Sequence, residues 1–339
     1  MTSSAVSLNA MAAPYYEALL QSPQSLRVTQ VKIGDFYVVD AGIRSPGSYE
    51  AGKLVSQMCA AGMLDLSFGI STYGKFDVPT VYVHSDMPAL AFLGGTYGDW
   101  EISETGFSAI GSGPARALAL RRDLPKGVRE NVSRKAYNYR IYDPSQIFSL
   151  IDHQEKSDDA YLLLETSGYP SEKLLGWIAS QVGVDRKGLH VVVARTSSMT
   201  MSVRLASSVA ETGLHKLVLL GLDPKKVRVA FGSAPLPPTV FGDDARANGM
   251  ANDAIRYGGS AYYEVEEGAL EGIDLRSLPP THLNTDFFTL MKDGFYSVDL
   301  GDFSAAKFTI VVGRKAVTVG RVREDLLISS FFGSAKGVP

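Results

Sequence analysis

Cysteine is almost absent from this chain, and the patterns that bind structural zinc are missing with it. The 339 residues contain a single cysteine, Cys59, so no disulfide can form within the chain. The five histidines are scattered and no Cys-x-x-Cys pair accompanies them, which argues against a zinc site. This composition favours a reducing cytoplasm, and we expect no metal.

Long apolar runs and an excess of basic residues are also absent. No apolar stretch approaches the roughly 18 residues that a membrane span needs, and the N-terminus has no basic region leading into an apolar core. The net charge of −3 gives no general attraction for nucleic acid or for an anionic membrane. We therefore expect a soluble globular protein without a nucleic-acid or membrane partner.

What is present is an alternation of strand-like and helix-like segments, which is typical of α/β layers. The segment 27–42 predicts a hairpin around Gly34. The segment 47–62 predicts a helix that Ser48 caps. We expect Cys59, on this helix, to pack in the core rather than to carry redox chemistry.

A second α/β series follows further along the chain. It begins with the apolar strand pattern AYLLLE at 160–165, continues through a capped helix at 171–183 and reaches the strand pattern LHVVVA at 189–194. A long helix is predicted at 201–221. The fold class expected from both series is α/β.

The length of the chain favours two domains, and we place them at 1–150 and 158–332. A basic and polar connection at 121–157 separates them, and a disordered tail is expected at 333–339. Within the connection, 121–140 has seven Lys and Arg against two acidic residues, with tyrosines between them. This pattern fits either contact with nucleic acid or an anionic ligand tail, or a solvated surface segment.

The glycine-rich stretch AIGSGPARALAL at 109–120 resembles a phosphate-binding turn that runs into a helix. A dinucleotide fingerprint fails because Arg116 occupies the third glycine position and the preceding ISETGFSA is too polar for a buried strand. A P-loop fails because no Gly-Lys-Ser/Thr follows. Two alternatives stay open: Gly111, Gly113 and Pro114 form a structural turn, or they start a helix whose N–H groups hold an anion or a ring carbonyl.

One helical stripe concentrates polar groups. Arg204, Ser208, Glu211 and His215 are spaced by four, three and four residues, which stacks them along one face of the predicted helix. Such a stripe faces either water or a site.

Several motifs, taken together and in order, carry a resemblance to a known family. GSGPARAL, ETGLHKL, GSAPLPP, NDAIRYGG and FYSVDLGDFS, with VSLN near the start, DAGIRSPGSYEAG, GTYGDW, and TSS after the strand at 189–194, resemble methenyltetrahydromethanopterin cyclohydrolase. The resemblance spans nearly the whole chain. It implies two α/β domains facing each other across a pterin-binding pocket, a homotrimer, and no metal or redox cofactor.

The activity implied by the resemblance is reversible hydrolysis of the methenyl bridge of a tetrahydromethanopterin to the 5-formyl compound, a step of one-carbon metabolism. Because the bridge carbon is an electrophilic amidinium, the protein needs to orient the ligand, aim one water and move its proton. The resemblance implies that Glu211 is the base. It implies a set of substrate-binding residues: Tyr97, Gly111, Ser112, Gly113, Pro114, Arg116, Arg195, Thr196, Ser197, Ser198, Ser208, Asn252 and Asp253.

The chain departs from the family pattern where charge is expected. Ser208 and Met250 stand where the family has arginines, and Arg195 stands where it has a proline. We expect Arg204 or Arg195 to supply the displaced positive charge, with His215 as the candidate nearest to Glu211 on the helix. The alternative to a divergent enzyme is a non-catalytic or repurposed pterin-binding paralogue.

Overall fold

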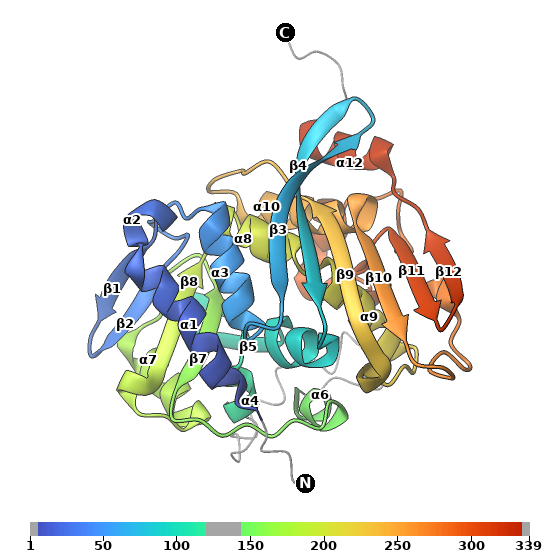
Figure 1. Ribbon diagram of the computed structural model, residues 1–339. Helices are drawn as coiled ribbons and strands as arrows, with labels where there is room; N and C mark the ends of the chain where they lie inside the picture. The colour runs from blue at the N-terminus through green and yellow to red at the C-terminus, as the bar shows by residue number, and fades with distance from the viewer. Residues whose placement is uncertain (1–5, 120–143, 334–339) are drawn as a thin grey trace. The chain divides into compact units, whose positions relative to one another are not determined.

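The computed structural model describes residues 6–119 and 144–333, which fold into two compact units (Figure 1). Of these residues, unit 1 comprises 6–64, 89–119 and 144–204, and unit 2 comprises 65–88 and 205–333. The sequence placed the boundary near residue 150, but the strands at 160–165 and 189–194 pair into the sheet of unit 1. The basic segment 121–140 and the tail from 334 onward lie outside the described residues.

Unit 1 is built on a six-stranded sheet of order β1-β2-β8-β7-β6-β5. Strands β2, β8 and β7 run parallel to one another, and β6 is antiparallel to β7. The strands are β1 Thr29–Ile33, β2 Phe36–Asp40, β5 Trp100–Glu104, β6 Phe107–Ser112, β7 Ala160–Glu165 and β8 Leu189–Ala194. The helices are α1 Leu8–Gln21, α2 Pro23–Leu26, α3 Tyr49–Cys59, α4 Ala115–Ala119, α6 Pro144–Leu150, α7 Glu172–Val182 and α8 Met199–Ala206, and η1 Ala89–Thr96 is π-helical.

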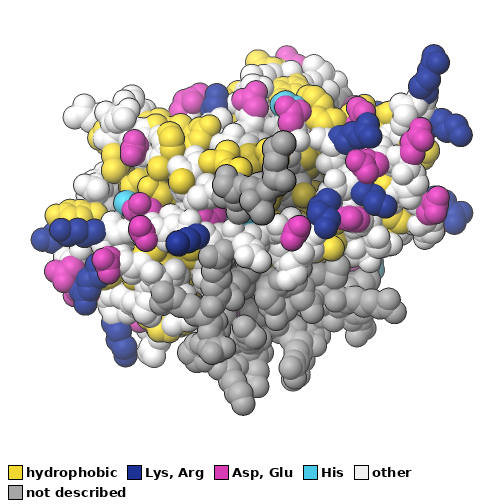
Figure 2. All heavy atoms as spheres, turned by 60° about the horizontal axis from the view of Figure 1, so that its bottom comes forward, with side chains coloured by type: hydrophobic (Ala, Val, Ile, Leu, Met, Phe, Trp, Pro, Cys, Tyr) yellow, Lys and Arg dark blue, Asp and Glu magenta, His cyan; other side chains and the backbone are white. Residues whose placement is uncertain are grey.

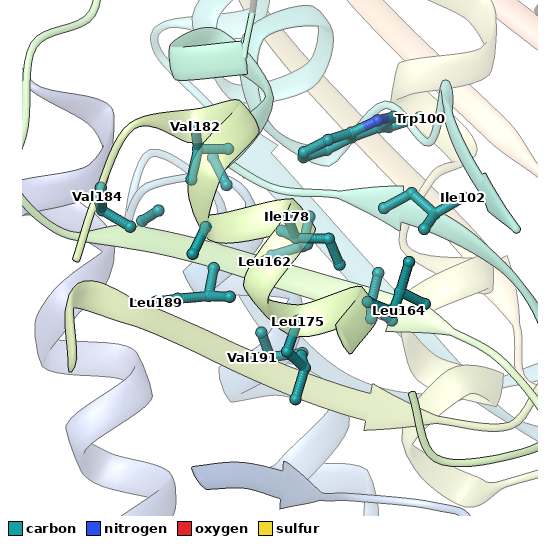
Figure 3. Close-up of a cluster of buried hydrophobic side chains, with 14 of the residues drawn as sticks. Trp100, Ile102, Leu162, Leu164, Leu175, Ile178, Val182, Val184, Leu189 and Val191 are labelled. Carbon is teal, nitrogen blue, oxygen red and sulfur yellow. The ribbon is translucent and has the colours of Figure 1, made fainter. Parts of the chain in front are cut away.

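Helices cover both faces of the unit 1 sheet. On one face, Leu162 of β7 and Val191 of β8 pack against Leu175 and Ile178 of α7 (Figure 3). On the other face lie α1 and α3, which pack against each other and against β7. Because both faces are covered, β7 and β8 are apolar at nearly every position, as parallel strands in a three-layer unit are.

The local predictions in unit 1 are confirmed. Ser48 accepts a hydrogen bond from the Ala51 N–H and caps α3, and Cys59 is fully buried. The stretch ISETGFSA, too polar for a buried parallel strand, lies in the β5–β6 hairpin, whose turn contains Gly106 at a φ of 79°. Because β5 is an edge strand, its outward positions tolerate polar side chains.

Unit 2 has its own six-stranded sheet, of order β12-β11-β10-β9-β4-β3. Its strands are antiparallel except for β10 and β11, which are parallel. They are β3 Asp65–Tyr73, β4 Phe76–Ser85, β9 Val227–Pro235, β10 Ser260–Val265, β11 Lys307–Val312 and β12 Lys315–Gly320. The helices are α9 Val209–Leu219, α10 Asp244–Asp253, α11 Phe287–Leu290 and α12 Glu324–Phe332, and η4 Ala254–Gly258 is π-helical.

Helix α9 lies against one face of this sheet (Figure 1). A Cβ atom at Gly213 would overlap with the Tyr263 hydroxyl and the Phe308 ring, so the glycine lets the helix approach the strands closely. The α/β class predicted from the sequence is confirmed in both units. No helix among residues 6–119 and 144–333 has the length and apolarity to cross a membrane.

Candidate active site

The glycine-rich turn after β6 is held in place by backbone contacts. Gly113 adopts a φ of 114°, and its N–H donates to the Gly95 carbonyl at 2.9 Å. A Cβ at this position would lie 2.9 Å from the Tyr161 carbonyl oxygen. Glycine is therefore required here by the fold itself, and a β-branched residue at Gly113 would not be a clean probe of ligand binding.

The turn has an anchor that the sequence reasoning did not single out. Asn9, fully buried in the first turn of α1, donates from Nδ2 to the Pro114 carbonyl at 3.1 Å and accepts from the Tyr161 N–H at 3.0 Å. Its one sequence signal is the VSLN motif, in which it is the last residue. Helix α4 begins at Ala115, directly after Pro114, as predicted.

Arg116 is buried and its charge is already paired. Its guanidinium forms a two-pronged ion pair with Asp99, in which Nη2 lies 2.6 Å from Oδ2 and Nε contacts Oδ1. The guanidinium carbon lies 5.9 Å from the centre of the Tyr97 ring and 5.4 Å from that of Phe148. Arg116 therefore holds Tyr97 and the turn in place. Its partner Asp99 belongs to the GTYGDW motif, but the sequence analysis did not identify it as a site residue.

The second group of expected ligand residues follows β8. The Thr196 hydroxyl donates to Glu165 Oε1 at 2.6 Å, and Ser198 Oγ accepts from the Met201 N–H at 3.1 Å at the start of α8. These residues lie where β2, β8 and β7 end together. Ligands of open α/β sheets bind at such carboxyl ends.

The two groups in unit 1 lie at opposite ends of β7. Because β6 is antiparallel to β7, Gly113 lies beside Tyr161 near the start of β7, whereas Thr196 contacts Glu165 at its end. Four residues of strand separate these positions by about 13 Å. Arg204 joins the first group, since its Nη2 donates to the Thr96 carbonyl. The sequence had listed all of these residues as one set.

The prediction of one long helix at 201–221 is wrong. Helix α8 ends at Ala206 and α9 begins at Val209, with a turn at 207–208 between them. Ser208 takes the N-cap position of α9 with backbone angles of −75° and 2°. Arg204 is therefore not on the helix that carries Glu211, and the expected continuous polar stripe is divided between two helices.

The break changes the surroundings of Glu211. The residue is 6% exposed and lies in the first turn of α9 rather than in the middle of a longer helix. The positive end of a helix dipole stabilises a carboxylate in that turn. Burial lowers the pKa of His215 to about 4, so its imidazole is neutral near pH 7 and does not provide the positive charge that we expected of it.

The residues expected around 252 have structural partners. Asp253 is buried and accepts hydrogen bonds from Arg256, from the Phe287 N–H and from Ser330 at 2.8–3.0 Å, and its burial raises the pKa to about 6. Asn252 donates from Nδ2 to Asn248. The contacts of Asp253 tie the end of α10 to η4, α11 and α12.

Met250 is buried in a hydrophobic cluster. Its neighbours in the cluster include Tyr73, Val78, Tyr257 and Leu327. The position at which the resemblance implied an arginine is therefore part of the core of unit 2.

Metal ligands are not clustered in the part of the chain that the structure describes. No group of three or more His, Cys, Asp and Glu side chains there could hold a metal ion. The available chemistry is that of a buried carboxylate at a helix N-terminus in unit 2, and of glycine, serine and threonine loops at the strand ends of unit 1.

Comparisons with known proteins agree with the resemblance. The family described as Cyclohydrolase (MCH) matches residues 7–132 and 139–331. The chain belongs to this family. Its membership makes it a hydrolytic enzyme of the cyclohydrolase type, as expected.

Curated relatives match over most of their lengths. The methenyltetrahydromethanopterin cyclohydrolase of Methanococcoides burtonii is 32% identical over 304 residues, which cover 87% of this chain and 88% of the relative. The protein of the same name from Methanothermobacter marburgensis is 32% identical, with 96% and 99% covered. That of Methanococcus maripaludis is 33% identical, with 96% and 98% covered.

Proposed function

We propose that the chain catalyses the reversible hydrolysis of methenyltetrahydromethanopterin to its 5-formyl form. Water adds to the methenyl carbon, one carbon–nitrogen bond of the amidinium opens, and the cationic substrate and water become the formyl product and a proton. The observation that carries the proposal is the family match, which extends through both units and includes α9 with Glu211.

Glu211 acts as the base in this proposal. It accepts a proton from the attacking water as the oxygen–carbon bond forms, and a proton is delivered to the nitrogen that departs. The start of α9 stabilises the carboxylate form in the absence of the arginine that the family has at Ser208. His215 lies one turn further along α9, and its imidazole is neutral near pH 7, so it supplies no charge to Glu211.

Unit 1 has polar groups of its own that suit a pterin ligand. We assign the backbone of Gly111, Ser112, Gly113 and Pro114 to one part of the substrate. The loop at 195–198 is assigned to another part, since polar atoms at carboxyl strand ends suit a polar ligand. Tyr97 and Arg204, fixed by their contacts with Arg116 and with Thr96, complete the first group.

Five further properties belong to the proposal. The enzyme works in the cytoplasm, in one-carbon metabolism. It assembles as a homotrimer. It needs neither metal nor redox cofactor, and it binds no nucleic acid.

Decay of the methenyl chromophore of the substrate tests the proposal. The purified chain should accelerate this decay without added nucleotide, and a chelator should leave the rate unchanged. A rate that falls after chelation and returns with a metal ion would contradict the metal-free reaction.

The same assay separates the enzyme from a pterin-binding paralogue. The replacement of two family arginines by Ser208 and Met250 is the observation that favours the paralogue. A chain that binds the substrate tightly, yet lets its absorbance decay at the uncatalysed rate, would be such a paralogue.

A further inference from the structure

Asp40, the last residue of β2, fixes the course of the loop that follows this strand. Its Oδ1 accepts hydrogen bonds from the Gly42 and Ile43 N–H groups at 3.0 and 2.7 Å. Its Oδ2 accepts from the N–H groups of Arg44 and Ser45 at 2.9 and 3.0 Å. One buried carboxylate therefore satisfies four consecutive backbone donors of this segment, which we call the β2 loop.

A second loop is attached to the same carboxylate. Tyr169 lies between β7 and α7, and its hydroxyl donates to Asp40 Oδ2 at 2.6 Å. Burial by itself would raise the pKa of Asp40, but the hydrogen bonds from Tyr169 and from the backbone outweigh it and hold the pKa below its ordinary value. The ionised carboxylate therefore links the loops that follow β2 and β7, on either side of β8 (Figure 1).

The β2 loop also packs against the loop that follows β8. A Cβ atom at Gly42 would lie 2.5 Å from Ser198 Oγ, so the two loops touch at this point. Ser198 belongs to the segment 195–198, which we assigned to the substrate. The β2 loop is thus a direct neighbour of a proposed binding loop, at the carboxyl ends of three adjacent parallel strands.

Arg44 is the charged side chain that the β2 loop carries at this edge. It is exposed, and its guanidinium carbon lies 5.2 Å from the centre of the Tyr169 ring. Within residues 6–119 and 144–333, no carboxylate forms an ion pair with it. The donors of a guanidinium match the oxygens of a carboxylate or phosphate, so this edge of the sheet suits an anionic group.

We propose that Arg44 binds an anionic group of the substrate, and that Asp40 is the positioning residue that holds Arg44 and Tyr169 in place for it. The inference rests on the proposed function and adds a residue contact to it. Ligands of open α/β sheets bind at the carboxyl ends of the strands, which is where the β2 loop lies. Because Asp40 is buried beneath the loop, it acts through Arg44 and does not touch the ligand.

The first test compares two arginines that each lie over an aromatic ring. Arg44→Gln should raise the KM and the dissociation constant of the substrate about tenfold and leave kcat within about twofold, because the contact is the same before and in the transition state. Arg186→Gln is the matched control. Its guanidinium carbon lies 5.5 Å from the centre of the Phe36 ring, at the first residue of β2, and its replacement should leave both constants unchanged.

Inorganic phosphate tests the chemistry of the bound group. At constant ionic strength, phosphate should compete with the substrate in the unmodified chain, and its inhibition constant should rise about tenfold in Arg44→Gln. Equal inhibition of both chains, or none in either, would contradict an anionic group at Arg44.

Asp40→Asn tests the positioning role. The amide replaces one carboxylate oxygen by an NH2 group, which cannot accept from backbone N–H groups, so part of the loop loses its hydrogen bonds. The KM should rise about tenfold with little change in kcat. Combined with Arg44→Gln, it should raise the KM no further than the larger single change does, because both substitutions remove the same contact. A double variant with the product of the two rises would show that Asp40 does not act through Arg44.

Two further variants separate positioning from stability. Tyr169→Phe keeps the ring and removes one hydrogen bond to Asp40, so it should raise the KM by less than Asp40→Asn does, and it serves if the latter fails to fold. Leu162→Ala removes a fully buried side chain from β7 and should lower stability without a change in KM. A rise in KM in Leu162→Ala equal to that in Asp40→Asn would reduce the role of Asp40 to stability.

Equilibrium binding of the substrate keeps this inference distinct from the proposed function. A chain that binds the substrate without turnover would contradict the enzyme proposal, while the affinity of Arg44→Gln would still be measured. An unchanged dissociation constant in folded Arg44→Gln would overturn the inference, whether or not the unmodified chain is active.

Discussion

The two sheets of this protein have the same number of strands, but their strands differ in how many side chains are buried. Five of the six residues of β7 in unit 1 are buried, because helices cover both faces of its sheet. In unit 2, the six residues of β10 alternate between intermediate exposure and burial, because α9 covers a single face. The difference teaches that the number of sheet faces packed by helices decides whether a strand is apolar throughout, as β7 is, or alternates, as β10 does.

The largest difference in stability between the two units should follow from the loss of one partner of a buried ion pair. Arg116 in unit 1 has one carboxylate partner, Asp99, whereas Arg256 in unit 2 has two, Asp253 and Asp302. Asp99→Asn leaves a buried guanidinium without a counter-charge and should lower the free energy of unfolding by about 3–5 kcal/mol. Asp253→Asn should cost clearly less, because Asp302 remains. Urea denaturation of both variants makes the comparison, and equal losses would contradict it.

The next largest effect on the free energy of unfolding should come from the truncation of side chains on strands. Leu162→Ala on β7 removes a fully buried side chain and should cost about 2–5 kcal/mol. Val317→Ala on β12 removes a side chain that is 45% exposed and should cost less than about 0.5 kcal/mol. The midpoints of urea unfolding measure both. A loss in Val317→Ala as large as that in Leu162→Ala would contradict this comparison.

The smallest effect is a pH dependence confined to unit 2. A hydrogen bond to Asp302, whose Oδ2 lies 2.6 Å from Nδ1, raises the pKa of His282 above its ordinary value. The protonated imidazole therefore stabilises the fold fully below about pH 6.5, and this contribution is lost as the pH rises through the raised pKa.

Thermal melting across that range should show the loss, and His282→Asn should remove it. An unaltered profile in His282→Asn would contradict the assignment.

Much of the fold could be read from local sequence. The strands at 160–165 and 189–194 and the helix that Ser171 caps lie where the pattern placed them, because apolar runs and caps are local signals. The assignment of segments to the two units could not be predicted from such local signals. The hairpin at 65–88 joins the later strands through β4–β9 pairing, which no local pattern specifies.

The candidate site was predicted in parts. The motifs located Glu211 and the loops, but the partners Asn9 and Asp99 are distant in sequence from the groups that they hold. The break at 207–208 was missed because two serines interrupt an otherwise regular helical pattern without a glycine or proline. That break decides the surroundings of Glu211. Figure 2 shows acidic and basic side chains interspersed over the coloured part of the surface in view.

The most direct test of the central claim is the turnover of Glu211→Gln beside that of His215→Asn. If the start of α9 carries the base, Glu211→Gln should lose about 10²-fold to 10⁴-fold in the rate of methenyl hydrolysis. His215→Asn should stay within a few-fold of the unmodified chain, because its imidazole carries no charge near pH 7. Full activity in Glu211→Gln, with the fold intact, would contradict the account.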